Sequence, residues 1–328
     1  LPPRQGLYDP NFEHDACGIG MIADINGRKS HEVVEDALKI LERLDHRGAR
    51  GADEDTGDGA GIMVQIPHEY FKRECHGLGF ELPEEGEYAF MASKEAFEQA
   101  GMDEIFLQQH EVGVIFAAGI GGISTFEQEI AYYYQNQANG PKFNPFFIPK
   151  MISDIAAGQI SIMYGFRGPN YSTASACASS TNALIDAFNY IRLGKANMIV
   201  AGGAESAITP GGVGGFNALT ALSTRNDSPE TASRPFSKSR DGFVMGEGAG
   251  CLILEELDHA LARGANILCE VAGGGMSADA YHLTATHPEG LGAKLVMARA
   301  LKDAGMKPED IDYINVHGTS TPVGDISE

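Results

Sequence analysis

Cys177 is the residue of this 328-residue chain whose surroundings best suit covalent chemistry. Its neighbours are all small, namely Ala174, Ser175, Ala176, Ala178 and Ser179. The apolar residues that follow predict one face of a helix, and they are Ala183, Leu184, Ala187, Phe188 and Ile191. At the start of that helix, its dipole and unpaired N–H groups would favour thiolate over thiol. A buried packing cysteine is the alternative, but hydroxyl neighbours do not suit an apolar core. We therefore predict a nucleophile.

His317 is the candidate partner of this thiol. It follows the apolar segment Ile311 to Val316, which we predict to be a strand, and it precedes Gly318 and a run of hydroxyl residues. Sites in α/β sheets gather at the carboxyl ends of strands. A structural histidine is the alternative, but the adjoining glycine and hydroxyls favour a functional one.

A set of alternating strands and helices must position these two residues. The predicted strands are Val112 to Ala117, Met198 to Ala201, Cys251 to Leu254, Ile267 to Val271 and Ile311 to Val316, and the predicted helices include 92–100, 179–193 and 292–304. This alternation predicts an α/β sheet. Glycine-rich turns at 118–122, 202–205 and 273–275 suggest a crevice at the strand ends, where backbone approaches a ligand closely.

Composition excludes several classes of partner. The formal net charge is −21, from 24 basic and 45 acidic residues, which argues against nucleic acid or an anionic membrane. No segment is long and apolar enough for a membrane span. The five cysteines form no CxxC pair, and no histidine pattern predicts a metal site. We expect a cytoplasmic protein without a metal.

The first part of the chain differs from the rest. Charged residues are denser before about residue 90, and the polar stretch 81–87 contains both proline and glycine, so we predict a domain boundary at residue 88. Four strings in this part resemble the opening of the glutamate synthase large subunit: Gly6 to Pro10, Glu13 to Gly20, His46 to Ala49, and Thr56 to Gly61.

That resemblance implies an α+β fragment of an N-terminal-nucleophile glutamine amidotransferase over residues 1–88. Residues 1–16 would be a propeptide, and cleavage after Ala16 would free Cys17 as the nucleophile. Arg47 would hold the α-carboxylate of glutamine, a task that suits a planar bidentate donor.

Residues 89–328 resemble a different family, the β-ketoacyl-acyl-carrier-protein synthases, and the elongating synthase II group in particular. The strings that carry the resemblance are Asn144 to Pro149, Ala174 to Ala178, Ala221 to Asn226, Arg240 to Gly250 and His317 to Pro322. They imply a thiolase-like layered α/β fold, incomplete at both ends and lacking its C-terminal part.

The resemblance also implies an activity, a decarboxylating Claisen condensation in fatty acid elongation. Cys177 would carry the acyl group as a thioester and His317 would stabilise the enolate oxygen. Thr319, Thr321 and Thr284 would meet the phosphopantetheine arm of the acyl carrier protein, so the chain would need no cofactor of its own. We expect a homodimer.

The two resemblances in one chain indicate a chimera of two incomplete enzymes. The synthase covers most of the chain, so we favour that activity, and we expect truncation to impair its condensation step. Two alternatives remain, the glutamine amidotransferase of the first part and a non-catalytic acyl-binding or interaction module.

Overall fold

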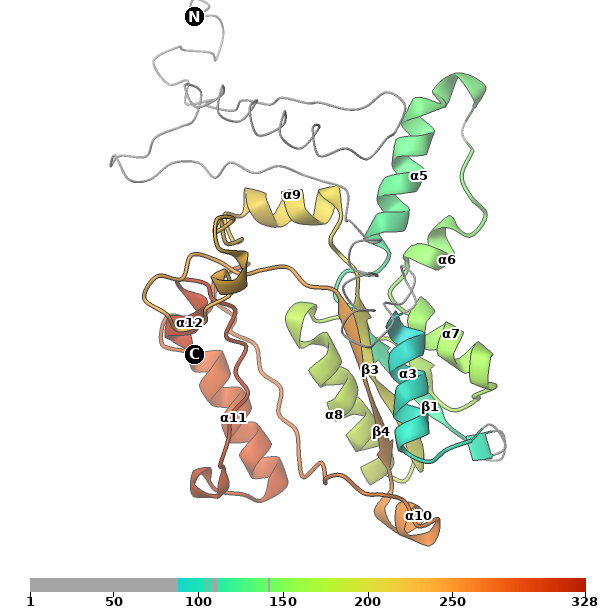
Figure 1. Ribbon diagram of the computed structural model, residues 1–328. Coiled ribbons are helices and arrows are strands. Elements are labelled where there is room, and N and C mark those ends of the chain that lie inside the picture. Colours follow the sequence, from blue (N-terminus) through green and yellow to red (C-terminus); the bar gives the residue numbers. More distant parts are fainter. Residues whose placement is uncertain (1–87, 104–105, 108–110, 141) are drawn as a thin grey trace, which may run out of the picture.

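The computed structural model describes residues 88–328, except 104–105, 108–110 and 141 (Figure 1). Within this part of the chain the strands form one sheet in the order β2-β1-β3-β4. β1 (Gly113–Ala117) is parallel to β2 (Asn170–Tyr171) and to β3 (Met198–Glu205). β4 (Gly248–Glu255) runs antiparallel to β3. The sheet is therefore mixed.

The two central strands are buried on both faces, which explains their continuous apolar sequences. All five residues of β1 are buried. Because side chains alternate along a strand, Val114 and Phe116 contribute to one core and Ile115 and Ala117 to the other. Residues of β3 divide between the two cores in the same way. The result is a sheet between two layers of helices.

Helix α8 (Ser179–Arg192) covers one face of the sheet. Its residues Ala183 and Ala187 are fully buried against Ile115, Ile199 and Ala201. Small side chains on this face let the helix approach the strands closely. The N-terminus of α8 lies at the carboxyl ends of β1 and β3, so the residues just before the helix lie at that edge of the sheet (Figure 1).

Helices α3 (Tyr88–Gln99) and α7 (Ile155–Tyr164) cover the opposite face. Phe97 is the centre of this core, because its ring makes edge contacts with Tyr164 and Phe166 at centroid distances of 4.7 and 5.7 Å. Ala157 and Ile160 of α7 are fully buried beside it. The first helix of the described region is thus part of the sheet domain.

The remaining elements extend from this sandwich. They are α5 (Ile123–Gln135), α6 (Phe147–Met151), α9 (Pro210–Ala218), α10 (Leu257–Ala262), α11 (Leu291–Ala304) and α12 (Gly324–Ser327), with short 3₁₀ turns at Gln137–Asn139, Ala176–Ala178, Pro229–Thr231 and Pro308–Asp310. Helices α5 and α6 project beyond the sheet, and α11 stands beside α8 (Figure 1). Arg192 at the end of α8 bonds Asp303 of α11 at 2.8 Å. No helix among the described residues is long and apolar enough to cross a membrane.

Three of the five predicted strands are confirmed as β1, β3 and β4, and the three predicted helices as α3, α8 and α11. The strands predicted at Ile267 to Val271 and Ile311 to Val316 are wrong, because neither segment is a strand. A strand needs a neighbour to satisfy its N–H and C=O groups. In the described part of the chain these segments have no ladder partner, and their apolar side chains stay exposed, Leu268 to 67% and Ile314 to 57%.

Candidate active site

Cys177 lies in the 3₁₀ turn that leads directly into α8, and it is exposed. The turn is sharp because Ala176 takes a left-handed backbone conformation with φ 51°, which non-glycine residues rarely adopt. Ser179 holds the turn together. Its Oγ accepts a bond from the Ser175 N–H at 2.8 Å and donates to the Ala176 carbonyl at 2.6 Å. The predicted position at a helix start is thus confirmed.

His317 reaches the same place from 140 positions further along the chain, and each residue changes the protonation of the other. The hydrogen bond to His317 and the charge of that imidazole lower the pKa of the Cys177 thiol, although partial desolvation by the surrounding atoms opposes them, since the residue is exposed on its other side. The bond to Cys177 likewise raises the pKa of His317 against its own burial. The pair therefore favours thiolate and imidazolium. The sequence predicted this pairing, although the strand expected before His317 is absent.

The segment that carries His317 is held by carboxylates. The Glu328 carboxylate accepts the backbone N–H groups of His317 and Gly318 at 2.6 and 2.7 Å. Ser320 is fully buried with φ 68°, and its N–H donates to Asp325 at 3.1 Å. Its Oγ accepts the Arg234 N–H at 3.1 Å. These bonds fix a strained backbone immediately after the histidine.

Arg240 connects this segment to a second loop. Its guanidinium bonds the backbone carbonyls of Thr321 and Pro322 at 2.9 and 2.7 Å. The same guanidinium pairs with Asp325 at 3.2 Å, and the two side chains are only 13% and 1% exposed. Because this pair is shielded from solvent, removal of either side chain would leave the charge of the other uncompensated.

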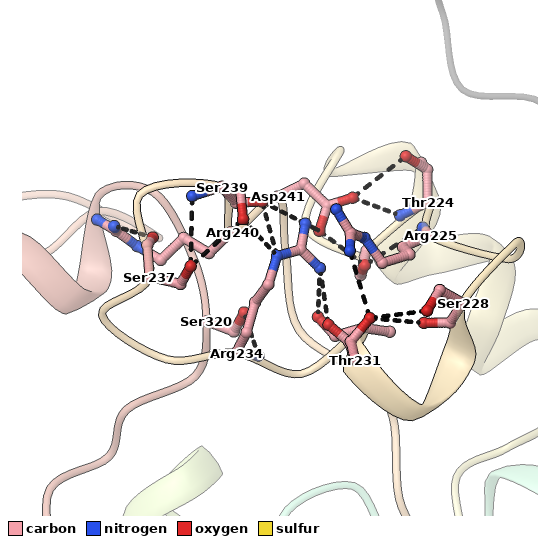
Figure 2. A network of polar contacts seen from close by, with 12 residues as sticks. Thr224, Arg225, Ser228, Thr231, Arg234, Ser237, Ser239, Arg240, Asp241 and Ser320 are labelled. Atoms are coloured by element: carbon pink, nitrogen blue, oxygen red, sulfur yellow. Dashed lines mark hydrogen bonds and ion pairs between the residues drawn. The ribbon is translucent and has the colours of Figure 1, made fainter.

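The loop that supplies Arg240 is itself a polar network (Figure 2). Arg234 bonds Asp241 at 2.9 Å and the carbonyls of Thr231 and Ser239 at 3.0 and 2.7 Å. Burial alone would raise the pKa of Asp241, but bonds from Ser223 and Thr224 and the Arg234 charge hold that pKa below its usual value. The network therefore stays charged and rigid near neutral pH, and it braces the His317 segment.

The other predicted site residues are not all brought together. Thr319 and Thr321 are neighbours, since their Oγ1 atoms lie 3.0 Å apart. Thr284 is exposed, and its N–H donates to His282 Nδ1 at 3.2 Å. Its loop reaches the C-terminal segment two residues later, where Thr286 and Ser327 hydroxyls are 2.7 Å apart. Cys17 and Arg47 lie outside the described residues.

The sequence analysis missed the residues that support the site. Arg240 stands in a string that carried the family resemblance, but nothing in the sequence links it to Asp325, 85 positions away. Ser320 gives no signal either, because its burial and positive φ are set by tertiary contacts. Among the described residues, no cluster of histidine, cysteine, aspartate or glutamate could hold a metal ion.

Comparison with known proteins finds matches to the profiles of two families. Residues 85–260 match the profile of the β-ketoacyl synthase N-terminal domain, and residues 268–328 that of the C-terminal domain. Residues 17–116 match the profile of class-II glutamine amidotransferases. The chimera inferred from the two resemblances fits these matches.

Relatives agree with the larger match. A 3-oxoacyl-[acyl-carrier-protein] synthase 2 of Staphylococcus aureus is 48% identical over 242 residues, which are 74% of this chain and 59% of that protein. The Synechocystis protein of the same name is 49% identical over 242 residues, covering 74% and 58%. The chain thus spans less than two thirds of the length of these relatives.

Solved structures share the fold. A β-ketoacyl synthase from Burkholderia phymatum has a TM-score of 0.69 and 29% identity, covering 91% of this chain and 72% of its own. A ketosynthase bound to a hexaketide, in complex with its type II polyketide synthase acyl-carrier protein, has a TM-score of 0.67 and 32% identity, covering 74% and 60%. The predicted thiolase-like α/β fold is therefore confirmed.

Proposed function

Because this chain belongs to the β-ketoacyl synthase family, we propose that Cys177 accepts an acyl group from acyl carrier protein in a fatty acid condensation. The observation that supports this most directly is the contact of Cys177 with His317, which lowers the thiol pKa. The thiolate sulfur attacks the thioester carbonyl carbon. The carbonyl re-forms as the bond to the phosphopantetheine sulfur breaks, and that sulfur takes up the proton that His317 holds.

The second half of the reaction joins two carbon atoms. His317 first regains a proton from solvent. Malonyl-carrier protein then loses carbon dioxide, and the electrons of the broken C–C bond form an enolate, whose oxygen receives a hydrogen bond from His317. The enolate carbon attacks the acyl carbonyl on Cys177, and the cysteine sulfur leaves as thiolate. The Thr319 and Thr321 hydroxyls, 3.0 Å apart beside the histidine, are suited to bond the phosphopantetheine arm, and Thr284 is a third candidate.

Peptide mass mapping after incubation with an acyl thioester tests the proposal. We expect an acyl adduct on Cys177, none on Cys251, and none on the Cys177→Ser variant. Cys251 is the matched control because burial raises its thiol pKa to about 12, so little thiolate forms there. An unmodified Cys177 would refute the proposal. It would favour the non-catalytic acyl-binding module, as would alkylation of Cys177 no faster than that of Cys251.

The proposal extends to partners and setting. Phosphopantetheine arrives on the carrier protein, so the chain uses no resident cofactor, and the protein works in the cytoplasm. The exposed aromatic residues of α5 and α6 support a homodimer. We place the boundary between the two family segments at residue 88.

A glutamine amidotransferase is the second candidate, and the match of residues 17–116 favours it. Removal of residues 1–16 would free the α-amine of Cys17 as the base for its own thiol. Intact mass spectrometry would detect that loss, and glutamate release from glutamine would report the activity. A retained segment together with no glutamate release would refute this candidate.

A further inference from the structure

The loop that follows β1 is held by a single carboxylate. Glu205, the last residue of β3, accepts the N–H groups of Gly119 and Ile120 at 2.8 Å each through Oε2. Its Oε1 accepts the Gly121 N–H at 3.3 Å. Three successive amides pointing at one acidic side chain form a concave anion site, and here the protein fills it with its own residue.

This loop lies directly against the turn that carries Cys177. A Cβ atom added at Gly119 would stand 3.3 Å from the Ala176 carbonyl oxygen and 3.0 Å from Glu205 Oε2. The glycine backbone therefore fits between the carboxylate and the turn. Ala176 has φ 51°, a strained conformation for a non-glycine residue that persists only where its surroundings enforce it.

The turn that carries Cys177 is therefore contacted from two sides. Ser179 holds Ser175 and Ala176 from the α8 side through bonds of 2.8 and 2.6 Å. On the other side Gly119, the first residue of the loop, packs against the Ala176 carbonyl. We propose that Glu205 is a positioning residue for the Cys177 nucleophile, because its carboxylate fixes the loop that keeps Ala176 in its strained conformation. This inference rests on the proposed role of Cys177.

Glu205 acts through the backbone rather than through its charge. Three amide donors surround the carboxylate, and Glu205 is not among the groups that shift the Cys177 pKa. A glutamine could keep the main contact, since the Gly119 and Ile120 amides share one oxygen atom. An alanine would lose all three bonds. Comparison of the glutamine and alanine variants therefore separates the effect of the hydrogen bonds of Glu205 from the effect of its charge.

The pH profile of Cys177 alkylation by iodoacetamide in the full chain tests the proposal. For Glu205→Ala we expect the rate at pH 7 to fall about tenfold, equivalent to a thiol pKa higher by about one unit as the contact with His317 loosens. Glu205→Gln should keep the original profile. Glu127→Ala is the matched control, because Glu127 of α5 also accepts a backbone amide, but that amide is the N–H of Gly211, at 2.7 Å, and not one of the loop.

A profile for Glu205→Ala that matches Glu127→Ala would overturn the proposal, and so would a glutamine variant as impaired as alanine. If Glu205→Ala does not fold, Gly119→Ala is the second variant. Its Cβ would crowd Glu205 Oε2 at 3.0 Å and the Ala176 carbonyl oxygen at 3.3 Å, so it should move the profile in the same direction. An unchanged profile in a folded Gly119→Ala variant also contradicts the proposal. Alkylation does not require acyl transfer, so a missing acyl adduct would refute the proposed function and leave this test intact.

Discussion

Cys177 and His317 alter each other's protonation, and this has a consequence for pH dependence. Because the hydrogen bond to His317 lowers the thiol pKa, thiolate persists to lower pH than at an ordinary cysteine. We expect Cys177 alkylation to remain fast at pH 7, where Cys251, with its thiol pKa raised to about 12 by burial, is unreactive. Peptide-resolved alkylation rates between pH 5 and pH 9 measure both. Equal profiles for the two cysteines would contradict this.

Removing the imidazole should reverse the effect. In His317→Ala the thiol loses its hydrogen bond and the neighbouring positive charge, while the burial that raises its pKa remains. We therefore expect the midpoint of the alkylation profile to rise by about one unit, a change of about 1.4 kcal/mol in the thiolate's free energy. His259→Ala is the control, since His259 pairs with Glu255 at 2.5 Å at the far end of β4.

At this scale the sequence placed Cys177 and His317 together as candidates, a contact that the structure contains, but it did not indicate the residues that support them. Cys177 and His317 could be singled out because a thiol and an imidazole stand beside small residues and a glycine in the sequence. Nothing in the sequence distinguishes Glu205 and Asp325 from other acidic residues. Only the fold brings their carboxylates to the backbone amides of Gly119 and Ser320. A residue that acts through another residue's backbone leaves no local pattern.

One buried ion pair, Arg240 with Asp325, lies among the bonds that join the loop around Arg240 to the His317 segment. Asp325 is 1% exposed, and its loss would leave Arg240 without its countercharge and the Phe236 and Ser320 amides without acceptors. We expect Asp325→Ala to lower the free energy of unfolding by about 3 kcal/mol. Urea denaturation measures this. Glu98→Ala removes an exposed pair with Lys94 and should change stability by about 0.5 kcal/mol or less. Equal losses would show that the buried pair has no special role.

Close approach of β3 and β4 depends on glycine at one position. A Cβ at Gly202 would collide with the Gly250 carbonyl oxygen of the paired strand, which cannot move without breaking the ladder. We expect Gly202→Ala to yield little folded protein, as judged by soluble yield and circular dichroism. Gly250→Ala is the matched control, because a Cβ there meets nothing within 4 Å. Similar yields of both variants would contradict the steric argument.

An apolar segment was correctly predicted as a strand where a neighbouring strand of the described sheet pairs with it. β1 and β3 read as buried strands because their apolar runs are covered on both faces. Ile311 to Val316 carries an equally apolar pattern, yet it pairs with no strand in the described region, and Tyr313 is 78% exposed. Hydrophobic pattern sets a preference for strand, whereas pairing requires a neighbour.

At the scale of the whole molecule, two family matches overlap between residues 85 and 116. In this stretch α3 and β1 contribute Phe97, Val114 and Phe116 to the core formed with α7 and β3. The packing therefore assigns the described part of the overlap to the synthase sheet. The boundary at residue 88 stays a prediction, because charge density and breakers mark a change of composition but carry no information about packing.

Helices α5 and α6 carry exposed apolar side chains, and this is the surface at which we propose that a second copy of the chain packs. Neither helix has a buried residue, and Phe126, Phe146 and Ile148 are 46%, 64% and 54% exposed. Phe143 stacks on Tyr133 and Phe147 at centroid distances of 5.2 and 5.6 Å, so this surface is already ordered and would lose little entropy on association.

Phe146→Glu should therefore weaken self-association without unfolding the chain. In the proposed dimer, a charge buried at this surface would raise the dissociation constant at least about tenfold, or about 1.4 kcal/mol. Sedimentation velocity over a range of concentrations measures this constant. Leu261→Glu is the control, since Leu261 is 59% exposed on α10, at the other end of the molecule. A monomer at every concentration, or equal effects of the two substitutions, would refute this surface as the dimer interface.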